Sequence, residues 1–224
     1  MRRLAPILLA SLALIAAGCG DDDGGGGTTA AATDATSTVT EQGCRAVAAP
    51  QPKQVDLERP SSRLERGASV TVTLVTNCGE IPIALDTERQ PRTASSFAYL
   101  AEEGVFDGLS FHRVVPGFVV QGGDPSGDGT GGPGYTIRER PPADAAYTRG
   151  VVAMAKTEIE RPGTSGSQFF IVTAEDAQLP PDYAIVGEVT GDGMTVVDRI
   201  EAVPTDGETP TEPVVIERAT VSEG

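Results

Sequence analysis

The stretch from Phe111 to Asp124 constrains the fold most, because two strand-like runs there flank a turn and carry several polar side chains. The first run, 111–115, is apolar and β-branched. Pro116-Gly117 is typical of a turn, and strand character resumes over 118–121. The pattern therefore predicts a β-hairpin in the middle of the chain.

Strand alternation predicts which side chains of this hairpin meet. Residues two apart in a strand share a face, so Arg113 points away from His112, and Gln121 shares a face with Val119. If the two runs pair across the turn, Arg113 and Gln121 lie close enough to form a hydrogen bond. A planar cationic donor would then be oriented by an amide beside aromatic surface. The alternative is an ordinary hairpin whose arginine forms a surface ion pair.

The whole string F-H-R-V-V-P-G-F-V-V-Q-G-G-D resembles the signature of the cyclophilin-type peptidyl-prolyl isomerases at every fixed position. Gly-Ser-Gln-Phe-Phe-Ile at 166–171 and Gly-Thr-Gly-Gly at 129–132 resemble two further motifs of that family. The resemblance covers roughly residues 69–222. It implies a mainly-β fold, a closed antiparallel eight-stranded β-barrel capped by two α-helices, and a prolyl isomerase that needs no cofactor or metal.

Hydrophobic periodicity independently favours such a fold. Alternating or buried-type runs predict strands at 69–76, 80–86, 150–156, 168–173, 184–189 and 213–221. One helix is expected to begin near Pro91 and Thr93 and to end at Gly104, and a second spans 193–203. Several strands with two helices suggest an antiparallel barrel whose ends are covered.

The resemblance also implies the site. An X–Pro bond isomerises slowly, and a catalyst must stabilise a twisted amide whose nitrogen can accept a hydrogen bond. Arg113 is the expected donor, Gln121 orients it, and Phe118 belongs to the proline pocket. His112 is either a further catalytic group or a packed histidine with a local hydrogen bond. The matching substrate-binding positions are Val119, Ala155, Lys156, Gln168, Phe170, Leu179 and Tyr183.

Four positions depart from patterns that are frequent in the family. Val119 stands where many members have Met, and Lys156 where Asn is frequent. Gln178 replaces a Trp of many eukaryotic members, which argues against tight cyclosporin binding more than against catalysis. Tyr183 replaces a His, and its phenol can still form a hydrogen bond at the pocket rim.

The first 43 residues differ in character from the rest. Residues 1–18 have two arginines followed by an apolar run, which predicts a secretory signal peptide. The run ends in Ala-Ala-Gly-Cys, similar to a bacterial lipobox, with Ala16 where Leu is usual, so Cys19 is a candidate lipidation site. An ordinary signal cleaved nearby is the alternative. Residues 19–43 are rich in Asp, Gly, Thr and Ala, and predict a disordered linker that tethers the domain.

Cys44 and Cys78 remain as an even pair if Cys19 is lipidated, which predicts a disulfide in an exported protein, with two free thiols as the alternative. Residues 44–68 are interpreted as an extended arm. The formal net charge of −15 disfavours nucleic acid and anionic headgroups. The expected partners are Pro-containing polypeptide clients, and the membrane through a lipid anchor, with a monomeric protein at the outer face of the cell membrane or secreted as a soluble form.

A second function of another class fits the same residues. Gln178 and the charged loop at 157–163 are compatible with a cyclophilin-like module that binds Pro-containing segments with little turnover. Acceleration of proline isomerisation at substoichiometric protein distinguishes the enzyme from this module.

Overall fold

The structure is a computed structural model that describes residues 38–61 and 63–224. The predicted signal peptide, Cys19 and most of the predicted linker lie outside the described residues. Among the helices in the described ranges, none has the length and apolar character needed to cross a membrane.

Two helices and thirteen strands follow one another along the described chain. The strands are β1 (Val70–Thr76), β2 (Gly79–Leu85), β3 (Leu109–Ser110), β4 (Arg113–Val115), β5 (Val119–Gly122), β6 (Ile137–Arg138), β7 (Val151–Met154), β8 (Thr164–Ser165), β9 (Phe169–Val172), β10 (Ile185–Val189), β11 (Thr205–Asp206), β12 (Thr209–Pro210) and β13 (Val215–Glu223). The helices are α1 (Pro91–Glu102) and α2 (Gly193–Glu201). The long predicted strands and both predicted helices are confirmed.

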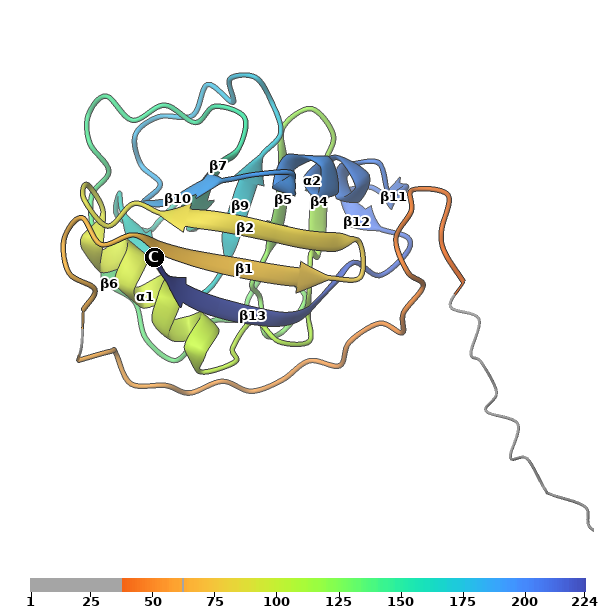
Figure 1. Ribbon diagram of the computed structural model, residues 1–224, viewed down its shortest axis with the longest axis horizontal. Coiled ribbons are helices and arrows are strands. Elements are labelled where there is room, and N and C mark those ends of the chain that lie inside the picture. Colours follow the sequence, from red (N-terminus) through yellow and green to blue (C-terminus); the bar gives the residue numbers. More distant parts are fainter. Residues whose placement is uncertain (1–37, 62) are drawn as a thin grey trace, which may run out of the picture. The chain divides into compact units, whose positions relative to one another are not determined.

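One antiparallel sheet of nine strands carries the fold, in the order β3-β13-β1-β2-β10-β7-β9-β5-β4. Its two edge strands, β3 and β4, are consecutive in sequence and separated only by Phe111 and His112. The sheet must therefore curl until its edges approach each other (Figure 1). The predicted mainly-β, antiparallel fold with two helices is confirmed, although the strands form a curled nine-stranded sheet with β3 and β4 at its two edges. The run from Phe111 was expected to be one strand, but His112 lies between the two edges.

The interior of the curl is filled by aliphatic and aromatic side chains. Phe97 of α1 lies 4.8 Å from Phe106 and 5.4 Å from Phe169 of β9, between ring centroids. Phe111 stands edge-on to the same Phe169 ring. The predicted apolar face of α1 is buried, and α2 packs on the sheet through Val197 and Ile200, which are fully buried.

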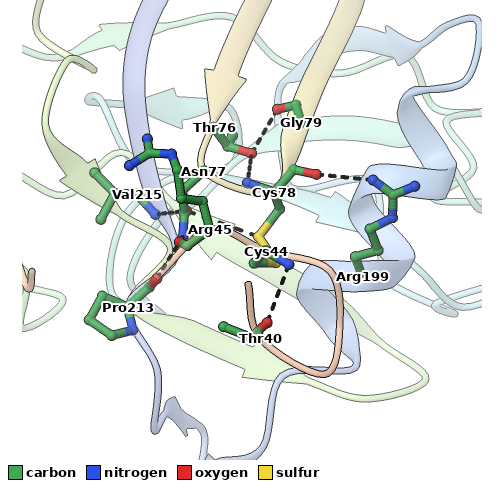
Figure 2. The surroundings of a disulfide bond; sticks show 10 residues. All are labelled: Thr40, Cys44, Arg45, Thr76, Asn77, Cys78, Gly79, Arg199, Pro213 and Val215. Carbon is green, nitrogen blue, oxygen red and sulfur yellow. Dashed lines mark hydrogen bonds between the residues drawn. A yellow bond between two sulfur atoms is a disulfide. The ribbon is translucent and has the colours of Figure 1, made fainter. Parts of the chain in front are cut away.

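A disulfide joins Cys44 to Cys78, the pairing that the sequence predicts (Figure 2). It attaches the arm to the turn between β1 and β2. Asn77 fixes that turn, because its Nδ2 donates to the carbonyls of Arg45 at 2.7 Å and Pro213 at 3.1 Å. Arg199 of α2 donates to the carbonyl of Cys78 at 3.3 Å. The arm, the β1–β2 turn and α2 are thus tied together at one end of the sheet.

Candidate active site

The outer face of β4, β5, β9 and β7 presents the candidate site, and strand alternation explains why. Phe169 of β9 points into the interior, whereas its neighbour Phe170 belongs to a separate apolar cluster on the opposite face. In β5, Val120 points inward and Val119 outward in the same way. Arg113 of β4 pairs with Gln121 of β5, as the hairpin register predicts.

A hollow of about 150 Å³ lies on this face. Most of the sequence-predicted site residues line it: Arg113, Phe118, Val119, Gln121, Ala155, Lys156, Phe170, Leu179 and Tyr183. The rings of Phe170 and Tyr183 meet edge to face at 5.5 Å. The floor is therefore apolar, and polar groups stand at the rim. We call this hollow the proline pocket, after the role that the family resemblance predicts for its lining residues.

The guanidinium of Arg113 is held from two sides. Its Nη1 donates to Oε1 of Gln121 at 3.3 Å. Its Nε and Nη2 donate to the two carboxylate oxygens of Glu208 at 2.5 and 3.3 Å. A guanidinium carries five N–H donors, so these contacts leave one N–H on each of Nη1 and Nη2 for an acceptor in the pocket.

Glu208 lies between β11 and β12 and is fixed by its own backbone, whose carbonyl accepts a hydrogen bond from Val114 at 2.7 Å. Hydrogen bonding from Arg113 lowers the pKa of Glu208, so the carboxylate is ionised at neutral pH. Sequence reasoning missed this residue. It is 95 positions away from Arg113 in a short polar loop, and no local pattern links the two.

A chain of amide hydrogen bonds extends from Gln121 to the glycine-rich loop. Nε2 of Gln121 donates to Oε1 of Gln168 at 3.1 Å. Nε2 of Gln168 donates in turn to the carbonyls of Gly129 at 2.9 Å and Gly131 at 3.0 Å. Gln168 lines a neighbouring hollow and not the proline pocket, and it connects the oriented arginine to the loop with the G-T-G-G motif.

Tyr183 is positioned through its backbone. The hydroxyl of the buried Tyr147 donates to the carbonyl of Tyr183 at 2.6 Å and accepts from its N–H at 3.0 Å. Burial raises the pKa of Tyr147 to about 12. The ammonium of Lys156 lies 5.3 Å from the centre of the Tyr183 ring, a cation–π contact. Gln178 is exposed and does not line the pocket.

The structure places His112 outside the proline pocket, although it shares a neighbouring cavity with Arg113 and Gln121. Within the described residues, neither ring nitrogen has a hydrogen-bond partner. Burial lowers the pKa of His112 more than the negative charge of Asp124 raises it, so the imidazole is neutral at pH 7. A catalytic role for His112 stays a prediction.

Comparisons with known proteins all match this chain to the same family. The family model described as cyclophilin type peptidyl-prolyl cis-trans isomerase/CLD matches residues 71–221. The chain is 42% identical over 172 residues to the probable peptidyl-prolyl cis-trans isomerase A of Mycobacterium leprae, covering 69% of this chain and 93% of that protein. It is 42% identical over 168 residues to the peptidyl-prolyl cis-trans isomerase B of Streptomyces anulatus, covering 66% of this chain and 94% of that protein.

Among solved structures, a cyclophilin type peptidyl-prolyl cis-trans isomerase of Cryptosporidium parvum, crystallised in the presence of the dipeptide Ala-Pro, superposes with a TM-score of 0.64. The two are 30% identical, and the match covers 69% of this chain and 99% of that one. The curled antiparallel sheet is therefore the cyclophilin fold. The chain belongs to the cyclophilin-type peptidyl-prolyl cis-trans isomerase family, and it is an enzyme with that activity.

Proposed function

We propose that the enzyme acts on an X–Pro bond whose proline ring occupies the proline pocket, with Arg113 as the hydrogen-bond donor to the prolyl nitrogen. The barrier to isomerisation, roughly 20 kcal/mol, comes from amide resonance. When the amide twists, its nitrogen becomes pyramidal, and its lone pair is no longer delocalised into the carbonyl and can accept a hydrogen bond. A donor fixed at that place stabilises the twisted state more than the planar one, which lowers the barrier.

The observation that carries this proposal is the two-sided hold on Arg113 at the rim of an apolar pocket. The guanidinium is oriented before the substrate arrives, so little reorganisation accompanies the reaction. Phe118, Phe170 and Leu179 supply apolar surface for a proline ring. The crystallisation of the Cryptosporidium parvum relative with Ala-Pro supports a Pro-containing peptide as the ligand.

The test is the cis-to-trans relaxation of an X–Pro peptide at substoichiometric enzyme. Arg113→Ala is expected to lower kcat/KM by about 10²-fold, the usual cost of losing one fixed donor. Arg218→Ala, an exposed arginine on β13, is the matched control and should leave kcat/KM unchanged. Circular dichroism checks that each variant is folded. A folded Arg113→Ala variant with full activity would contradict the proposed role of this residue.

We further propose that the clients are exported proteins and that the enzyme is a lipoprotein on the outer face of the bacterial cell membrane. The N-terminal pattern of residues 1–19 supports this location. The Cys44–Cys78 disulfide is a second supporting feature, because such bonds persist in oxidising compartments outside the cytosol.

Cell fractionation in a bacterial host tests the location. The parent chain should be found in the membrane fraction, and the mass of its mature N-terminus should include a lipid on Cys19. Cys19→Ala should move the protein to the soluble fraction without changing its isomerase activity. A parent protein that is soluble and carries no lipid would favour the secreted form.

A further inference from the structure

A second hollow adjoins the proline pocket, and one of its walls comes from the arm. The cavity has a volume of about 520 Å³, and its lining includes Ala49, Pro50, Gln51 and Pro52. Arg113 and Gln121 line it as well. The same two residues line the proline pocket, so the two hollows are neighbours on either side of the oriented guanidinium and its partner amide. We call this second hollow the arm groove.

The arm is anchored on both sides of this wall. Before it, the disulfide holds Cys44, and Arg45 donates from its N–H to the carbonyl of Asn77 at 2.7 Å and pairs with Glu217. After it, the N–H of Lys53 donates to Pro125 at 2.9 Å, and its Nζ donates to the carbonyl of Asp107 at 2.8 Å. Figure 1 shows the arm in orange, continuing toward α1. The wall therefore has a fixed position although it contains no strand.

The wall carries backbone groups that an extended peptide can bind. Within the described residues, the segment 47–52 makes no backbone hydrogen bond. Pro50 and Pro52 have no N–H and restrict the backbone, so the wall is stiff and rich in carbonyl acceptors. Ala49 and Gln51 are exposed. An extended polypeptide could satisfy these carbonyls with its own N–H groups, as in other complexes where a peptide lies beside an unpaired extended segment.

The arm does not obstruct catalysis. None of its described residues lines the proline pocket, so the arm forms a wall beside Arg113 and leaves the proline pocket open. The family match begins at residue 71, after the arm. The wall is therefore an addition to the part of the chain that matches the family model.

We propose that the arm groove binds the extended client segment next to the target proline, so that this enzyme prefers long, unfolded polypeptides to short proline peptides. The inference rests on the proposed function, because it places the client's proline in the adjoining pocket. The disulfide contributes by holding the wall at its distance from Arg113. Substrate preference is then set partly by residues 49–52, which take no part in the reaction at the prolyl bond.

A pair of tryptophan substitutions tests the wall. Ala49→Trp fills the arm groove, whereas Ala48→Trp places the same ring on the adjacent exposed residue, which does not line the groove. The substrates are a tetrapeptide with one X–Pro bond and a dodecapeptide with the same four residues at its centre. Ala49→Trp should lower kcat/KM for the dodecapeptide about fivefold or more and leave the tetrapeptide within about twofold. Ala48→Trp should leave both within about twofold.

A binding measurement keeps this test independent of turnover. Fluorescence anisotropy of a labelled dodecapeptide should report weaker binding to Ala49→Trp than to the parent or to Ala48→Trp. Reduction of the disulfide in the parent should weaken binding of the dodecapeptide selectively as well. If the two peptides respond equally, or if Ala49→Trp binds the dodecapeptide as the parent does, the arm groove is not a client site. If Arg113→Ala keeps full activity while Ala49→Trp acts selectively, the proposed role of Arg113 fails and the groove stands.

Discussion

Arg113 shows how a single residue acquires a defined orientation from two distant segments. Gln121 faces it across the β4–β5 hairpin, and Glu208 reaches it from the β11–β12 turn. The shortest contact is that of Nε with Glu208, at 2.5 Å, while the second contact with Glu208 and the contact with Gln121 are both 3.3 Å. Without Glu208, the guanidinium would therefore be free to leave the pocket rim. We interpret Glu208 as a positioning residue that acts through Arg113.

Glu208→Ala is accordingly expected to lower kcat by about tenfold, with little change in KM, since misplacing a reacting donor costs rate more than binding. Glu208→Gln should restore most of the loss, because its amide oxygen can still accept from Arg113. Glu212→Ala, an exposed residue in the connection between β12 and β13, is the control. Steady-state kinetics on an X–Pro peptide measure all three. Equal kcat for Glu208→Ala and the parent would exclude the positioning role.

His112 gives a pH-dependent stability with a predictable sign. Burial lowers its pKa in the folded state, although Asp124 and Asp128 oppose this and Arg113 adds to it. In the unfolded chain the pKa is ordinary, about 6.5. As pH falls below this value, the unfolded state binds a proton that the folded state does not. Stability present above pH 6.5 is therefore lost with acidification until the lower folded pKa is passed.

Urea unfolding at several pH values should show a steeper loss of stability as the pH falls below about 6.5 for the parent than for His112→Gln. Since the sequence has one histidine, its ring resonances report the folded pKa directly by NMR. A folded pKa at or above the ordinary value, with parallel stability curves, would show that burial does not control this group.

The two phenylalanines of β9 lie on opposite faces of the sheet, one in the hydrophobic core and the other at the proline pocket. Phe169 is fully buried among Phe97, Phe106 and Phe111, whereas Phe170 opens onto the proline pocket. Adjacent residues of a strand point to opposite faces, so one short strand serves both the interior and the site.

Phe169→Ala is expected to lower the free energy of unfolding by about 3–5 kcal/mol, the usual cost of deleting a buried phenylalanine ring. Phe170→Ala should cost less stability, because its ring borders an open hollow, but it should lower kcat/KM more. Denaturant unfolding and peptide kinetics on the two variants separate the effects. The reverse ranking of stabilities would mean that β9 faces the interior with the other side.

The predictable parts of this fold are those with a repeating local pattern. Alternation predicted β1, β2 and the Arg113–Gln121 pairing, and helical spacing predicted α1 and α2. The two-residue strands β3, β6, β8, β11 and β12 have too few residues to show a period, so they are visible only once their partners are placed. Glu208 could not be predicted from the sequence either, because its position beside Arg113 depends on where the β11–β12 turn packs. The arm groove also depends on tertiary placement, since the sequence predicts an extended arm but not where it lies.

For the whole molecule, the Cys44–Cys78 disulfide links a segment outside the family match to the cyclophilin fold. It closes a loop with a sequence separation of 34 residues. A cross-link of this span restricts the unfolded chain and is expected to stabilise the folded state by about 3–4 kcal/mol. The residues of the proline pocket all come later in the sequence and pack on other strands, so the bond should affect stability more than the chemistry of the pocket.

Cys44→Ser with Cys78→Ser should therefore unfold at lower urea concentration, with a loss of about 3–4 kcal/mol, and keep tetrapeptide kcat/KM within about twofold of the parent. The parent treated with a reducing agent should behave like the double variant, and the reducing agent should not affect the double variant itself. If tetrapeptide turnover fell together with stability, the arm would be supporting the pocket itself, for instance through the contact of Lys53 with the glycine-rich loop at Pro125. Unchanged stability after reduction would mean that the arm's hydrogen bonds and its Arg45–Glu217 ion pair suffice to hold it in place.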